Sequence, residues 1–313
     1  MSILNRSTAP KLAVHNAGRK LFGSKFATIT VWTIALIWTV PTFGLFVTSF
    51  RPKQDISATG WWQIFVHPHF TLDNYTSIFS TGSVSGISNG ILPYFINSLV
   101  ITIPAVIFPI VIATMAAYSL AWIKFKGSDA IFYGIFALQI VPIQVALVPL
   151  LKLFTGGAHV GSITLIPKLG IAGTFAGIWL PHTMFALPLA IYLLHNFISS
   201  LPRDLMEAAN VDGASHFTIF RRIVLPLSVP AIAAFTIFQF LWVWNDLLVA
   251  LTFTGGTEGI NPLNAKLSGL AGTWGSQWEL LTSSAFITIL IPLIVFFSLQ
   301  RYFVRGLLAG SVK

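Results

Sequence analysis

The chain has 313 residues, of which 55% are hydrophobic and only 9% are charged, and its mean hydropathy is +0.81. Soluble domains usually carry about 25% charged residues, so this composition excludes an ordinary water-soluble fold. The formal charge of +9 comes from short basic clusters between apolar runs, which argues against a nucleic-acid-binding face. The absence of Cys excludes disulfides and thiolate metal sites.

Hydropathy along the chain predicts an all-α membrane domain, because several apolar runs reach the roughly 20 residues that a helix needs to cross a bilayer. Of the 18 Lys and Arg residues, thirteen fall on the side of the termini, the side that the positive-inside rule makes cytoplasmic, and five on the other. We expect a cytoplasmic segment at 1–25, a six-span domain at 26–304 and a cytoplasmic tail at 305–313. No cleavage pattern follows the apolar run that begins at Phe26, so we expect no cleaved signal peptide. The six expected spans are about 26–50, 94–122, 130–151, 173–197, 226–253 and 282–304.

Prolines recur inside the expected spans, such as Pro104 and Pro109 in the second and Pro142 in the third. Each lacks an N–H group and leaves one helical carbonyl without its partner. Membrane bundles tolerate this when neighbouring groups supply a donor to the freed carbonyl. Kinked helices suit a cavity that opens and closes, although proline is common in membrane helices generally.

A long polar segment on the predicted cytoplasmic side, at about 199–226, carries the sequence LPRDLMEAANVDGASHFTIFRRIVLP. It predicts two short helices, with Ser200 as N-cap of the first, Gly213 as its left-handed end and Ser215 as N-cap of the second. Such a pair of helices can insert into a groove on a soluble partner and pass that partner's motion to the attached spans. The alternative is an ordinary helical hairpin that lies on the membrane surface.

The spacing within this loop resembles the EAA motif of ABC importer permeases. The matching residues are Glu207, Ala208 and Ala209, then Gly213 after three residues, Ile223 after nine more, and Leu225 and Pro226 after one more. The WVWND stretch at 242–246 and the C-terminal QRYFVRGLLAGSVK are similar to those of maltose-type carbohydrate permeases, so the resemblance extends over nearly the whole chain.

The resemblance implies the transmembrane domain of a type I ABC importer. In that family the loop docks on the ATP-binding subunit, so Glu207 would be an electrostatic anchor, Ala208 and Ala209 close-packing positions, and Asp212 with Gly213 the turn. This chain would bind no cofactor, because the partner ATPase uses ATP and Mg. The implied partners are a second similar permease, expected as a heterodimer, two ATPase subunits, an extracytoplasmic sugar-binding protein and the lipid of a bacterial or archaeal inner membrane.

Polar groups inside a membrane are costly and are candidates for the transport path. Aromatic faces and amide side chains also suit a sugar. Asp246 lies near the expected outer end of the fifth span, where a gate or sugar contact and a plain helix-end role are both open. His182 and His195 are expected to satisfy helix–helix hydrogen bonds rather than bind a metal. The path candidates are Gln239, Trp242, Trp244, Asn245 and Asp246.

The segment at 254–281 is long enough to reach outward as a flexible loop. In maltose-type permeases the matching loop inserts into the sugar-binding protein, and the resemblance implies the same here; a loose solvent loop is the alternative. The candidate contact residues are Gly255, Gly256, Glu258 and Asn261.

No P-loop, H-E-x-x-H or G-x-S-x-G pattern occurs, so the chain is not expected to be an enzyme and would take its energy from a partner. An ion-coupled secondary transporter would usually show paired mid-membrane charges and a repeated half, and neither is visible. A permease for a polyol or glycerol phosphate is the nearer alternative, because the coupling loop is shared across importers.

Overall fold

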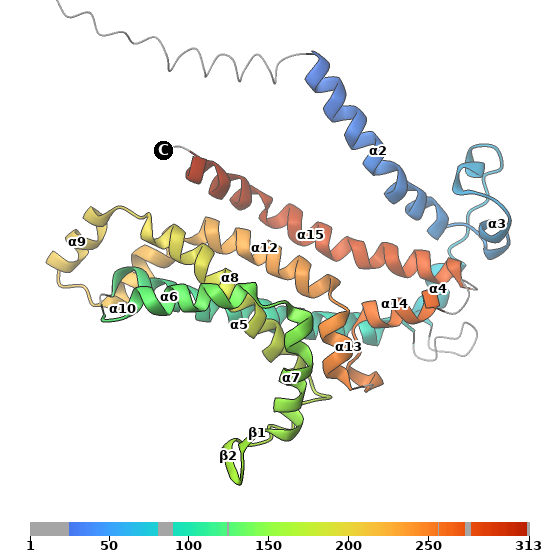
Figure 1. Cartoon of the computed structure of the whole chain (residues 1–313). Coiled ribbons are helices and arrows are strands. Elements are labelled where there is room, and N and C mark those ends of the chain that lie inside the picture. Colours follow the sequence, from blue (N-terminus) through green and yellow to red (C-terminus); the bar gives the residue numbers. More distant parts are fainter. Residues whose placement is uncertain (1–24, 81–89, 124, 256, 273–276, 312–313) are drawn as a thin grey trace, which may run out of the picture.

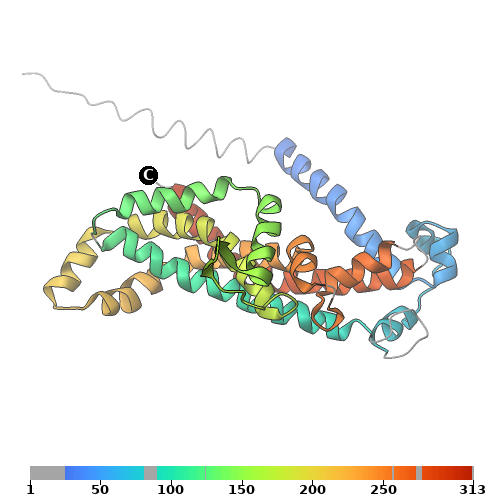
Figure 2. The same ribbon diagram turned by 60° about the horizontal axis from the view of Figure 1, so that its bottom comes forward.

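The computed structural model describes residues 25–80, 90–123, 125–255, 257–272 and 277–311. The chain folds into an elongated bundle of helices, with α9 and α10 at one end and α3 and α4 at the opposite end (Figures 1 and 2). The predicted all-α class is confirmed, with one small hairpin as an addition. In chain order the elements are α2 (Lys25–Ser49), α3 (Lys53–Ala58), η1 (Trp61–Phe65), α4 (Asp73–Phe79), α5 (Leu92–Trp122), α6 (Ser128–Ala137), η3 (Leu138–Ile140), α7 (Ile143–Gly156), β1 (Ala158–Val160), β2 (Ile163–Ile166), α8 (Phe175–Ser199), α9 (Arg203–Val211), α10 (His216–Ile219), η4 (Phe220–Val224, a π-turn), α11 (Leu225–Leu227), α12 (Val229–Asn245), α13 (Leu248–Thr254), η5 (Glu258–Ile260), α14 (Leu263–Gly272) and α15 (Trp278–Ser311).

Four helices of the described chain are long and apolar enough to cross a membrane alone: α2, α5, α8 and the Trp278–Arg301 part of α15. Two further candidate spans are bent pairs, Ser128–Ile140 with Ile143–Gly156 at 104° and His216–Leu227 with Val229–Asn245 at 68°. The third and fifth spans are therefore broken rather than continuous as expected. Six spans with cytoplasmic termini stay a prediction.

The structure describes the two ends of the chain to different extents. α15 continues through the predicted tail as far as Ser311, whereas residues 1–24 lie outside the described part of the chain. The last turns of α15 and the first turns of α2 both point toward the end of the bundle that carries α9 (Figure 1).

The centre of the bundle is the long contact between α5 and α8, with α12 packed against both and α15 packed against α12. Small residues make this contact close, because Ala113 and Ala117 on α5 and Ala190 on α8 have no exposed surface and belong to one apolar cluster. Helices in membranes commonly associate through such small side chains, which let the two backbones approach. This packed centre supports the groups described below.

Three proline-freed carbonyls are each bound by a side-chain N–H group from a neighbouring helix. A proline at position i leaves the carbonyl at i−4 without a donor, and the donors here are two indole groups and one amide. The predicted compensation by neighbouring helices is thus found at three positions. Trp179 Nε1 donates at 2.9 Å to Val100 O, the carbonyl that Pro104 frees. Gln239 Nε2 donates at 3.1 Å to Ala105 O, which Pro109 frees, and Trp244 Nε1 donates at 3.1 Å to Thr288 O, which Pro292 frees.

Two parts of the chain leave the bundle. α2 packs against α15 only near its end, and its side chains from position 28 to position 43 are exposed and mostly apolar. α7 turns away at the 104° bend and leads into the antiparallel hairpin β1–β2, where Val160 pairs with Ile163 across a turn at Gly161 (Figure 1). The sequence analysis did not predict this hairpin.

Candidate functional site

The loop at about 199–226 forms the two predicted helices, α9 and α10. Gly213 has φ of +74°, the left-handed conformation that favours glycine, and its N–H donates to Asn210 O at 3.0 Å. Ser215 Oγ accepts the N–H of Thr218 at 3.3 Å, as predicted for an N-cap. The local chemistry of the turn therefore follows directly from the sequence.

The start of the loop differs from the expectation. Ser200 does not cap α9; its hydroxyl donates to Phe197 O at 2.7 Å and so closes the end of α8. The N-cap position of α9 is Pro202, which supplies no side-chain acceptor. Proline suits this place because it has no N–H group to satisfy.

α9 turns one side toward the bundle and the other outward. Met206 and Ala209 are buried and belong to the apolar cluster between α5 and α8, whereas Glu207 and Ala208 are exposed. Ala209 therefore packs inside this chain rather than against a partner, while Glu207 and Ala208 are accessible. Asp212 and Gly213 at the turn are exposed as well.

The loop is fastened to the bundle by specific bonds. The Tyr118 hydroxyl on α5 lies 3.1 Å from His216 Nδ1 and also donates to His216 O at 3.3 Å. Trp122 Nε1 at the end of α5 donates to Ile198 O on α8 at 3.1 Å. The Tyr118–His216 contact therefore joins the loop to α5, and the Trp122 bond joins α5 to the end of α8 that leads into the loop.

The loop ends in the π-turn η4, from which α11 leads to the 68° bend. Val224 within this turn is fully buried, and the motif residue Ile223 is half-buried beside it. Leu225 and Pro226, which complete the motif, are exposed. The apolar end of the motif thus lies where the loop changes direction into the fifth span.

Of the five path candidates in the fifth span, two are occupied in packing. Gln239 and Trp244 are buried, and each supplies its N–H group to a proline-freed carbonyl as described above. Trp242 is half-buried, and Asn245 is exposed although its amide donates to Leu241 O at 2.7 Å. Trp242 and Asn245 are the candidates that keep accessible surface.

Asp246 follows the last residue of α12, and its carboxylate accepts the backbone N–H groups of Val249 at 3.4 Å and Ala250 at 3.0 Å. It therefore has the helix-end role that the sequence left open. The same carboxylate lies 3.4 Å from His182 Nε2 on α8. Spacing in the sequence gave no signal for this pair, because its members are 64 residues apart. The described residues contain no group of three potential metal ligands.

A hollow of about 210 Å³ lies beside the bend of the third span. Gln139 from η3 and Met184 and Phe185 from α8 are among its lining residues. Discontinuous membrane helices often mark solute sites, because their freed backbone groups can serve as polar ligands. The lining of this hollow is mostly apolar, and Gln139 is its polar side chain.

The segment at 254–281 is helical and anchored where it is described, in contrast to the flexible loop that was expected. Asn97 Nδ2 on α5 donates to Gly259 O at 3.0 Å and Asn261 O at 3.1 Å, and Leu263 N donates to Ser98 Oγ at 2.8 Å. Gly255 ends α13 with φ of +62°. Gly256 and the side chain of Glu258 lie outside the described part of the chain.

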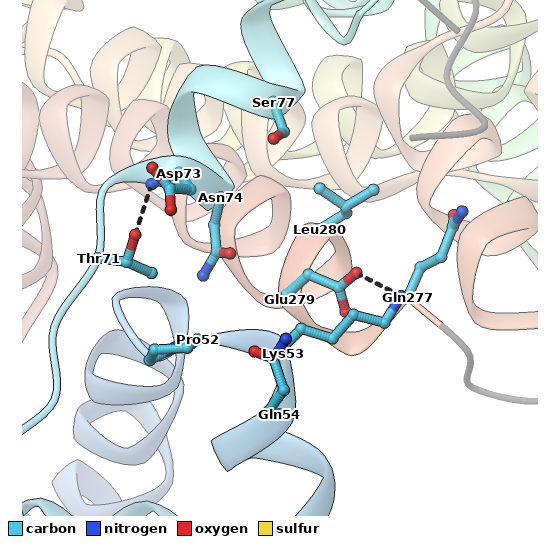
Figure 3. Close-up of a pocket in the computed structure, with 10 residues that line it drawn as sticks. All are labelled: Pro52, Lys53, Gln54, Thr71, Asp73, Asn74, Ser77, Gln277, Glu279 and Leu280. Carbon is cyan, nitrogen blue, oxygen red and sulfur yellow. Dashed lines mark hydrogen bonds and ion pairs between the residues drawn. The ribbon is translucent and has the colours of Figure 1, made fainter. Parts of the chain in front are cut away.

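A polar pocket of about 420 Å³ opens at the end of the bundle opposite α9, between the starts of α3, α4 and α15 (Figures 1 and 3). Lys53 Nζ lies 3.0 Å from the mostly buried carboxylate of Glu279 at its edge, and Asn74 donates to Ser49 O and Arg51 O at 2.9 Å. Nearby, burial raises the pKa of the Tyr75 hydroxyl, which its hydrogen bond with Ser49 lowers in part. The pocket is a preformed polar recess.

Long apolar helices joined to an anchored, outward-facing polar loop are the features of a membrane transport subunit. Residues 109–308 match the family of binding-protein-dependent transport system inner membrane components, and the chain belongs to this family. The predicted family is thereby confirmed, and the chain is a translocation component rather than an enzyme.

Individual relatives agree with this assignment. An osmoprotective compounds uptake permease protein of Synechocystis sp. is 51% identical over 289 residues, with 91% of each chain covered. An alpha-glucoside transport system permease protein of Rhizobium meliloti is 53% identical over 247 residues, which span 79% of this chain and 61% of that protein. A bacterial ABC transporter involved in import of the acidic polysaccharide alginate shares the fold, with a TM-score of 0.68 at 17% identity over 96% of this chain and 100% of that chain.

Proposed function

We propose that the chain is the permease subunit of an ATP-driven importer that translocates a mono- or oligosaccharide across the inner membrane of a bacterium or archaeon. The observation that carries this proposal is the two-helix loop. It combines the spacing of the EAA motif with an exposed Glu207–Ala208 surface and a hydrogen-bonded contact between His216 and Tyr118 of α5. A loop that is accessible on one side and fastened on the other can transmit a partner's motion.

The loop would dock on an ATPase subunit that binds ATP and Mg, since this chain carries no nucleotide-binding motif. Closure of two such subunits would move the loops together and switch the bundle between inward-facing and outward-facing arrangements. The second half of the pathway would come from a similar permease, in a heterodimer. The exposed apolar side chains of α2 are available to lipid or to that partner.

An extracytoplasmic binding protein would deliver the sugar at the opposite end of the bundle. The polar pocket beside Lys53 and Glu279 and the anchored segment that contains Gly255 and Asn261 lie on that part of the chain. A related permease fold occurs in an alginate transporter that was crystallised with a pentasaccharide-bound periplasmic protein. The solute would then pass Trp242 and Asn245, which offer an aromatic face and an amide.

The alpha-glucoside relative supports a sugar, and the osmoprotectant relative supports a second candidate, uptake of osmoprotective compounds. ATPase activity of the purified complex in lipid separates these candidates. It should be measured with and without loaded binding protein, across alpha-glucosides, other oligosaccharides, polyols and glycerol phosphate. Stimulation by a saccharide is the expected result. Stimulation by a polyol or glycerol phosphate alone would move the assignment to that solute, and absence of any partner ATPase would overturn the importer proposal.

A further inference from the structure

His182 and Asp246 form an ion pair that is enclosed on both sides. The exposed fraction is 1% for the His182 side chain and 9% for that of Asp246, and Nε2 lies 3.4 Å from Oδ2. The other two ion pairs of the described residues, Lys53–Glu279 and His69–Asp55, each have a partner that is more than half exposed. Ionisable residues inside a membrane domain are expensive and are functional candidates by default.

The two ring nitrogens of His182 have different partners. Nδ1 lies 2.9 Å from Ile178 O, and a carbonyl can only accept, so Nδ1 carries a hydrogen. The other ring nitrogen, Nε2, is the atom that faces the Asp246 carboxylate. Nε2 has no hydrogen-bond partner apart from this approach.

The carboxylate of Asp246 joins three elements at the break between α12 and α13. It accepts the first N–H groups of α13, it follows directly on α12, and it faces α8 through His182. The far end of α13 is also tied to the start of α8, because Gly173 N donates to Phe253 O at 2.9 Å. α13 is therefore clamped at both ends.

Trp242 stands one turn before this break, and its ring meets the His182 ring edge-on at a centroid distance of 5.5 Å. The imidazole thus touches both the aromatic path candidate and the carboxylate that fixes the end of α12. Asn245, the second accessible candidate, immediately precedes Asp246. A shift of the Asp246 carboxylate would therefore move both Trp242 and Asn245.

We propose that His182 is a positioning residue of the translocation pathway, which holds Asp246 through a buried contact between Nε2 and Oδ2 and so fixes where Trp242 and Asn245 stand. The inference rests on the proposed transport function. Removal of one member of such a buried pair is costly because the other is left unpaired, whereas neutralising both members is not.

The test measures sugar transported per ATP hydrolysed in proteoliposomes that hold the full complex, a ratio that does not depend on the amount of folded protein. His182→Ala leaves a buried carboxylate without its partner, and we expect this ratio to fall by about tenfold or more. Asp246→Asn keeps an oxygen for Val249 and Ala250 and an amide N–H for Nε2 of His182, so it should lower the ratio less than His182→Ala does.

The decisive variant combines both changes. In His182→Ala/Asp246→Asn the unpaired charge is gone while the α13 N–H groups keep an acceptor, so the ratio should recover several-fold over His182→Ala. His195→Ala on the same helix is the matched control, because its ring packs on Phe132 and its charge partner is Asp129 of α6 rather than Asp246. Adding Asp246→Asn to His195→Ala should not raise the amount of sugar transported per ATP.

Lack of rescue in the double variant, or equal rescue of His195→Ala, would overturn the proposal. If His182→Ala does not assemble, His182→Gln takes its place, because glutamine keeps an N–H donor and much of the volume but cannot form an ion pair with Asp246. Its ratio should also fall and be rescued by Asp246→Asn. A wild-type complex that transports no sugar would refute the proposed function instead, which keeps the two failures distinct.

Discussion

Single residues of the coupling loop differ in what they face, and Glu207 faces outward. It is exposed on α9 and makes no ion pair with the described residues. Glu207→Lys should therefore leave stability within about 0.5 kcal/mol, as surface changes usually do. It should abolish sugar-stimulated ATP hydrolysis, because it inverts a charge at a docking surface.

Thermal unfolding and ATPase activity of the purified complex measure the two parts of this prediction. Asp204→Lys is the matched control, since Asp204 is an exposed carboxylate one turn earlier on the same helix. An unchanged uptake rate in Glu207→Lys would remove this residue from the coupling assignment.

The turn between α9 and α10 depends on the left-handed backbone conformation of Gly213. A Cβ at this position would meet no atom within 4 Å, so a substitution acts only through the backbone at φ +74°. Gly213→Ala should cost about 1 kcal/mol, because residues with a Cβ disfavour the left-handed region. Gly134→Ala in α6 is the control: its site is equally open but helical, so alanine should be neutral or stabilising. Equal shifts in melting temperature would contradict this account.

At the scale of elements, the proline ties explain why α5 stays one helix from Leu92 to Trp122 despite two internal prolines. Gln239→Leu removes the donor to Ala105 O and should destabilise the protein by about 1–2 kcal/mol. In a Pro109→Ala background, the restored N–H at position 109 can bind the same carbonyl. The cost of Gln239→Leu should then shrink to near zero.

Denaturation of the four variants of this double-mutant cycle measures the coupling free energy. An additive result would show that Gln239 does not compensate Pro109. A loss of transport without loss of stability in Gln239→Leu would instead return this residue to the solute path.

The same elements show what the sequence could predict. Hydropathy located α2, α5 and α8 within two or three residues of their ends, because a long apolar run needs no tertiary information. It could not separate the breaks in the third and fifth spans from the continuous helices, because all contain proline. The side-chain donor that a proline-freed carbonyl receives from a neighbouring helix, such as Gln239 for Pro109, is likewise fixed only by packing.

The candidate site was predictable to a similar extent. The turn residues Gly213 and Ser215 follow from local rules of backbone conformation and capping, and the structure has them as expected. The targets of Gln239, Trp244 and Asp246 could not be predicted, because each bonds to a group on another helix or beyond a break. A polar residue in an apolar run shows that its side chain needs a hydrogen-bond partner, but the sequence does not show which group that partner is.

At the scale of the whole molecule, the loop and the pocket beside Glu279 lie at opposite ends of a bundle in which α5 runs most of the length (Figure 1). Tyr118 connects the loop to α5 by its bonds to His216. Tyr118→Phe keeps the ring that packs on Phe220 and removes only the hydroxyl. We expect at most about 1 kcal/mol of lost stability, and a clear fall in sugar transported per ATP.

Parallel assays of uptake and hydrolysis in proteoliposomes measure this ratio. Tyr133→Phe is the control, since Tyr133 is an exposed tyrosine on α6. A fall of the ratio in the control, or none in Tyr118→Phe, would show that the hydroxyl does not transmit loop motion.

The proline ties also have a consequence for the history of the sequence. Each tie joins a residue without an N–H group on one helix to a side-chain donor on another. Loss of the donor alone leaves a buried carbonyl unpaired, and loss of the proline alone makes the side-chain donor compete with the restored N–H for that carbonyl. Substitutions at 104 and 179, at 109 and 239, and at 292 and 244 should therefore occur as correlated pairs among relatives. A donor that disappears should be accompanied by replacement of its proline, and these three pairs of positions would record which helices have stayed neighbours.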